Sequence, residues 1–154
     1  MRSIKRSLQH EKSVVRVVLD TNVLVQASLA PFGPANGIIA FIFTGQVRPL
    51  FDERMLAEYE EVLTRPQFAF RRQVVERMIR QLRLAGELVT AYALPRDQAR
   101  HLPDATDAAF IEVAISAKAD VLISSNVRHF PSAACAGMPV LPPVTFLQTY
   151  VRLK

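Results

Sequence analysis

The chain has 154 residues and half of them are hydrophobic, which suits one globular domain able to bury its own core. A formal net charge of +5 favours polyanionic partners such as nucleic acid. A single cysteine excludes an intramolecular disulfide, and neither a run of about 18 apolar residues nor a signal-peptide pattern is present, so we expect a cytoplasmic protein.

The chain is predicted to be a basic, flexible arm over residues 1–13 followed by a single domain over residues 14–154. Residues 14–20 are rich in β-branched side chains, which is typical of a strand buried on both faces of a parallel sheet. Hydrophobic periodicity predicts helices at 23–30, 36–44, 53–64, 73–85, 106–118 and 144–152. Further strands are predicted at 47–51, 88–93, 121–125 and 139–141, although Pro49 removes a ladder donor from the first of these. This alternation predicts an α/β fold, a three-layer α/β/α sandwich with a mainly parallel central sheet.

Acidic and amide side chains occur where this fold would gather them. Open α/β sheets place functional groups beyond the carboxyl ends of their strands. Asp20 closes the first predicted strand, and Asn126 follows the strand at 121–125. The beginnings of helices supply Glu58 and the pair Asp104 and Asp107. Several oxygen ligands in one crevice are what a hard divalent cation such as Mg²⁺ or Mn²⁺ requires.

Each candidate also has a purely structural interpretation. Asp20 and the Asp104–Asp107 pair could cap helices, where negative charge is favourable. Glu58 could be a solvated flank of its helix, and the helical wheel places Glu58 and Glu60 each at an edge of the apolar stripe without deciding between them. His101 and His129 are isolated, and a loop histidine is more often ordinary surface than a catalyst.

With these residues in view, the sequence resembles the PIN-domain family, and within it the branch of toxin components of bacterial toxin–antitoxin pairs. Four segments carry the resemblance: VVLDTNVLVQA at 17–27, MLAEYEEVLTRP at 55–66, DATDAAFIEVA at 104–114 and ADVLISSNVRHF at 119–130. The resemblance implies that the three family carboxylates are Asp20, Glu58 and Asp107, with Asp104 as an accessory acid and Asn22 and Ser124 as polar supports.

Position 126 departs from the family pattern. Many family members carry a fourth Asp there, whereas this chain has Asn126. An amide oxygen can still bind a cation or its water, but it removes one negative charge, so a second metal ion should bind more weakly.

The function that the resemblance implies is a metal-dependent endoribonuclease. One or two Mg or Mn ions would be held by Asp20, Glu58, Asp107 and Asn126. The resemblance also implies an antitoxin partner and a homodimer. Arginines from two basic stretches either contact RNA or form a solvated surface. The first stretch includes Arg16 with the arm, and the second supplies Arg65, Arg71 and Arg72; Arg128 is a further candidate contact.

Three rival functions stay open at this point. The lost charge at Asn126 allows a catalytically weak RNA-binding or regulatory PIN domain. An aspartate-nucleophile phosphatase also has Asp after its first strand, but it usually has a second Asp two residues later, where this chain has Asn22. In a protein-interaction domain the clustered acids would be coincidence. The nuclease hypothesis depends on Asp20, Glu58 and Asp107 meeting around a shared cation.

Overall fold

The computed structural model describes residues 14–151, so the arm predicted at 1–13 and the predicted helix end at 152 lie outside the described residues. Its centre is a five-stranded sheet with the order β3-β2-β1-β4-β5, in which every pairing is parallel. The strands are β1 (Val15–Leu19), β2 (Val47–Phe51), β3 (Glu87–Leu88), β4 (Val121–Ile123) and β5 (Val140–Leu141).

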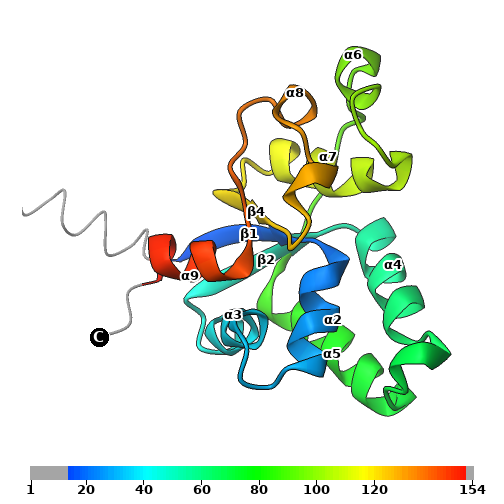
Figure 1. The fold of residues 1–154 in the computed structure, drawn as a ribbon, viewed down its shortest axis with the longest axis vertical. Helices are drawn as coiled ribbons and strands as arrows, with labels where there is room; N and C mark the ends of the chain where they lie inside the picture. Colours follow the sequence, from blue (N-terminus) through cyan, green and yellow to red (C-terminus); the bar gives the residue numbers. More distant parts are fainter. Residues whose placement is uncertain (1–13, 152–154) are drawn as a thin grey trace, which may run out of the picture.

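Helices cover both sides of this sheet, as Figure 1 shows, with α2, α3 and α5 below it and α7 and α8 above it. The longer helices are α2 (Thr21–Leu29), α3 (Pro34–Phe43), α4 (Glu53–Leu63), α5 (Arg72–Ala85), α7 (Ala108–Ser116) and α9 (Pro143–Tyr150). Short elements are α6 (Arg96–Ala99), α8 (Ser132–Cys135) and the 3₁₀ turns η1 (Pro66–Phe68), η2 (Ala105–Asp107) and η3 (Val127–His129). The predicted α/β sandwich with a parallel sheet is therefore confirmed. Within residues 14–151, no single helix is long and apolar enough to cross a membrane.

The order of the strands reverses beside β1. The chain runs from β1 to β2 and β3 on one side, then returns through α7 to place β4 on the other side of β1. Leu19 pairs with Ile123 at the end of the ladder, and the amide of Asp20 donates to the carbonyl of Ile123 at 2.9 Å. Since ligands of open α/β sheets bind at such a reversal, the carboxyl ends of β1 and β4 are where a site is expected.

Pro49 is accommodated inside β2 because its missing donor faces the short edge strand. In an extended strand the N–H and C=O of one residue point to the same side, and the Pro49 carbonyl lies against Gly86, next to β3. Pairing between β2 and β3 begins only at Leu50 with Glu87. The proline therefore removes no hydrogen bond from the central pairing of β2 with β1.

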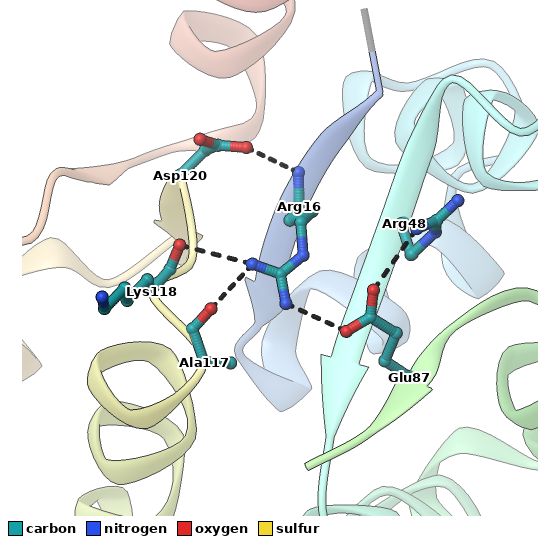
Figure 2. A network of polar contacts seen from close by, with 6 residues as sticks. All are labelled: Arg16, Arg48, Glu87, Ala117, Lys118 and Asp120. Atoms are coloured by element: carbon teal, nitrogen blue, oxygen red, sulfur yellow. Dashed lines mark hydrogen bonds and ion pairs between the residues drawn. The ribbon is translucent and has the colours of Figure 1, made fainter. Parts of the chain in front are cut away.

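Arg16 on β1 binds together the amino-terminal end of the sheet (Figure 2). Its Nη2 donates to Oε2 of Glu87 at 2.9 Å, and its Nη1 donates to the carbonyl of Ala117, which ends α7, at 2.7 Å. Its backbone amide donates to the Asp120 carboxylate at 2.8 Å, and Glu87 also accepts from Arg48 at 3.3 Å. A cation is favourable at a helix carboxyl end. The guanidinium of Arg16, which we had grouped with the basic arm, thus forms hydrogen bonds within the folded domain.

Most element boundaries lie within two residues of the sequence prediction, and two of the differences involve hydrogen bonds to side chains. The helix predicted from 106 begins instead at Ala108, because the preceding residues form the 3₁₀ turn η2. The strand predicted over 88–93 is only two residues long. The amides of Tyr92 and Leu94 donate to Ser116 Oγ and Glu112 Oε2 on α7, at 2.9 and 2.8 Å, rather than to a neighbouring strand.

Gly86 and Gly37 should respond in opposite directions to a single added methyl group. A Cβ at Gly86 would overlap the Pro49 carbonyl and lie 2.6 Å from the Phe51 ring, so we expect Gly86→Ala to destabilise the fold by about 1–3 kcal/mol. A Cβ at Gly37, inside α3, would make an ordinary 3.5 Å contact with Leu147, so Gly37→Ala should stabilise by roughly 0.5–1 kcal/mol. Urea unfolding of both variants measures this, and a stable Gly86→Ala protein would contradict the close approach of α5 to β2.

Candidate active site

Asp20 is held at the end of β1 by a residue at the end of β4. Its Oδ2 accepts a hydrogen bond from Ser124 Oγ at 2.7 Å, and the residue is only 6% exposed. Asp20 occupies the N-cap position of α2, but its side chain makes no capping hydrogen bond to that helix. Burial raises the pKa of Asp20, the Ser124 hydroxyl partly opposes this, and the charge of Glu58 adds to it. The side chain is therefore oriented by Ser124 rather than by helix capping.

Glu58 lies beside this carboxylate because α4 is attached to the end of β1. The hydroxyl of the buried Tyr59 donates to the Leu19 carbonyl at 2.5 Å. One residue earlier, Glu58 Oε2 accepts a hydrogen bond from Thr21 Oγ1 at 2.6 Å. Glu60 is exposed. The structure thus brings Glu58, and not Glu60, to the carboxyl edge of the sheet.

Asp107, the last residue of η2, completes the acidic group. The residue is 8% exposed, and its Oδ2 is buried with no hydrogen-bond partner in the described part of the chain. Burial, followed by the charges of Asp20 and Asp104, raises the pKa of Asp107 to about 6. Glu58 raises it further, so Asp20, Glu58 and Asp107 all lie within electrostatic range of one another.

The accessory residues divide into two groups. Ser124 contacts the site directly, and its Oγ also accepts from the backbone amide of Asn126 at 3.0 Å. Asp104 is exposed and caps η2, accepting from the amide and hydroxyl of Thr106 at 2.9 and 2.8 Å, and the backbone hydrogen bond lowers its pKa. Asn22 is exposed, and no hydrogen bond within residues 14–151 comes from its side chain. Roles for Asn22 and for the Asn126 amide stay predictions.

His129 is the neighbour of the site that sequence reasoning missed. Its Nδ1 lies 3.5 Å from Oδ2 of Asp107, and the imidazole lowers the pKa values of Asp20, Asp104 and Asp107. The η3 turn (Val127–His129) that follows β4 carries it there. Its position three residues beyond Asn126, after a strand that ends at the switch point, was the signal available in the sequence.

Two of the four arginines proposed for RNA contact are engaged in local ion pairs. Arg65 pairs with Glu61 at 2.9 Å and Arg72 with Glu76 at 3.3 Å, each one helical turn away. Arg71 is exposed beside them. Arg128 is exposed on η3, next to His129, and is the one of the four predicted contacts that comes from a segment of the site.

The donor set of carboxylate and amide oxygens suits a hard divalent cation. Among residues 14–151, no three Asp, Glu, His or Cys side chains are close enough to hold one ion as they lie. Ser124 and Thr21 each hold one acid by a hydrogen bond, and the sharing of one cation by Asp20, Glu58 and Asp107 stays a prediction. Mg²⁺ usually needs only one or two carboxylates with water and substrate phosphate. The unpartnered Oδ2 of Asp107 and the mutual repulsion of these acids fit such an open cation site.

Comparison with known proteins agrees with this architecture. A family model for the PIN domain matches residues 16–128. The crystal structure of PAE2754 from Pyrobaculum aerophilum is similar over 90% of both chains, with a TM-score of 0.53 and 14% sequence identity. At that identity the similarity shows the fold alone. No protein with a curated description matches the chain.

The raised pKa of Asp107 makes stability depend on pH. The folded-state pKa of Asp107, about 6, exceeds the ordinary 3.8, so folding favours the protonated form of this carboxyl. The contribution of Asp107 to the free energy of unfolding is therefore fully present below pH 4 and is lost as pH rises through about 6. Asp107→Asn removes this dependence. In EDTA, the melting temperature of Asp107→Asn minus that of the wild type should therefore increase by a few degrees from pH 4 to pH 7. Parallel melting curves for the two proteins over this range would contradict the assignment.

Proposed function

This chain belongs to the PIN-domain family, and from that premise we propose that it is a Mg²⁺- or Mn²⁺-dependent endoribonuclease. PIN domains are in general nucleases. The proposal for this chain is supported above all by Asp107, whose buried, unpartnered oxygen lies within electrostatic range of Asp20 and Glu58 at the switch point of the sheet. The carboxylates repel one another and His129 offsets this repulsion only in part, so the arrangement costs stability and suits metal binding.

Each side chain has a proposed part in the reaction. Asp20 and Asp107 would hold the principal ion, with Glu58 helping to hold it or orienting the attacking water, and Asn126 would assist a weaker second ion. When bound, such an ion lowers the pKa of the attacking water and offsets charge on the phosphoryl oxygens and the leaving 3′ oxygen. Ser124 and Thr21 keep Asp20 and Glu58 in fixed orientations, which reduces reorganisation when substrate arrives. Products with a 5′ phosphate and a 3′ hydroxyl are expected.

The biological setting is part of the same proposal. We infer a cytoplasmic toxin that forms a homodimer and is blocked by an antitoxin. The exposed apolar side chains on and between α2 and α3, namely Leu29, Phe32 and Phe43, are consistent with a partner protein covering that surface. The competing candidate is a catalytically weak RNA-binding PIN domain, which is favoured by the neutral side chain of Asn126.

Cleavage of RNA distinguishes these two functions. Purified protein with Mn²⁺ and a mixed single-stranded RNA should release fragments with 5′ phosphates, and Asp20→Asn should lower the rate on the order of a hundredfold or more. On α4, Glu58→Gln should also lower the rate, whereas the matched Glu60→Gln variant should cleave like wild type because Glu60 is exposed. Equal cleavage by wild type and Asp20→Asn would remove the nuclease. RNA binding without cleavage would favour the competing candidate.

Metal binding can be measured without any turnover. A ligand at about 100 times its dissociation constant stabilises the folded state by about 2.7 kcal/mol, which corresponds to roughly 5–10 °C for a domain of this size. We therefore expect saturating Mn²⁺ to raise the melting temperature by this amount in wild type and in Glu60→Gln. Asp20→Asn and Asp107→Asn should lose most of the increase. An unchanged metal response in both Asp variants would show that the ion binds elsewhere.

A further inference from the structure

A pocket lies directly beside the candidate site, between the beginnings of α4 and α7. Its volume is about 320 Å³, which is within the range of small-ligand pockets. Glu58 lines it, and so do Thr106 and Ala108, the two neighbours of Asp107 in the chain. The other lining residues are Arg54, Met55, Ala105, Ala109, Phe110 and Glu112. The pocket is therefore close enough to the proposed metal site to receive part of the same substrate.

Arg54 forms a fixed wall of this pocket. Its Nη1 donates to Glu112 Oε1 at 2.7 Å, and its Nε and Nη2 lie 2.8 and 2.7 Å from Asp52 Oδ2. Glu112 is 8% exposed, and its other oxygen accepts from the amide of Leu94, so this carboxylate cannot turn away. Two acids thus hold the guanidinium in one plane, yet 53% of the arginine side chain stays exposed.

Several of the other lining side chains are small. Ala105, Ala108 and Ala109 contribute only methyl groups, and Phe110, which also lines the pocket, is otherwise buried. Larger residues at the three alanine positions would fill the space. A pocket lined by a planar cation held in place and by methyl groups suits an aromatic ring that needs no particular pattern of edge hydrogen bonds.

We propose that this pocket receives the base of the nucleotide next to the scissile phosphate, stacked on the guanidinium of Arg54. The inference rests on the proposed nuclease function, because it assumes that the phosphate lies at the neighbouring acids. Arginine planes commonly stack on unpaired bases of single-stranded RNA. Because the contact is with the face of the base rather than its edge, purines and pyrimidines should both bind, and a base-paired nucleotide should not enter.

Mononucleotide binding tests this pocket independently of cleavage. We would titrate AMP, UMP and ribose 5-phosphate into the wild-type protein with Mg²⁺ present, because none of the three contains a phosphodiester bond that could be cleaved. Alanine methyl resonances would be recorded by NMR. Both nucleotides should shift the methyls of Ala105, Ala108 and Ala109 by ring currents, and ribose 5-phosphate should bind at least fivefold more weakly. Equal affinities for AMP and ribose 5-phosphate would overturn the proposal.

A pocket-filling variant supplies the control. Ala109→Leu in the otherwise wild-type protein should weaken AMP binding at least fivefold while leaving the affinity for ribose 5-phosphate within twofold. Ala40→Leu, on the exposed face of α3 and outside the pocket, should change neither. If Ala109→Leu does not fold, Ala105→Leu replaces it, since Ala105 is exposed. Unchanged AMP binding in a folded filling variant would also overturn the proposal, whereas loss of the nuclease proposal would appear separately as absent RNA cleavage in wild type.

Discussion

The arrangement of the site depends on the parallel pairing of β1 with β4. These strands are more than a hundred residues apart in the chain, and their ladder ends where the Asp20 amide donates to Ile123. One residue further along each strand, Ser124 donates to the Asp20 carboxylate at 2.7 Å. Because the side chains follow directly on the last paired residues, the register of the sheet decides the orientation of the first acid. At the opposite end of β1, Arg16 connects the same strand to β3 and α7.

The buried acids at this edge of the sheet lower the stability of the folded state, and the rest of the fold compensates for them. Asp20 and Asp107 both have raised pKa values, mainly through burial, and each is raised further by neighbouring carboxylates. The apolar core formed by the strands and the helices packed on them is large enough to tolerate such a cluster. Under the proposed function, a cation and a phosphate would compensate the repulsion within this cluster, and the adjoining pocket lined by Arg54 would receive the neighbouring base.

The strands and helices with strong periodicity were predictable, whereas local side-chain hydrogen bonds were not. The β2 prediction matches residue for residue, and α4 and α5 begin or end within one residue of their predicted limits. The helix predicted from 106 begins two residues later and the strand predicted over 88–93 is much shorter, because capping by Asp104 and hydrogen bonds from Tyr92 and Leu94 to α7 replace regular structure. Helices α6 and α8 have only four residues each, too few for any periodicity to reveal.

The sequence by itself determined the α/β class, the family and the candidates Asp20, Glu58 and Asp107, because buried strands and acids at strand ends leave a readable pattern. Hydrophobic periodicity left Glu58 and Glu60 undecided, and only the family resemblance favoured Glu58. Tertiary structure supplies the physical reason, since Tyr59 attaches α4 to the end of β1 and Thr21 donates to Glu58, while Glu60 is exposed. It also decided that Arg16 is hydrogen-bonded to Glu87 and to the end of α7, and that His129 lies against Asp107. These are contacts between residues distant in the chain, and no local pattern encodes their distances.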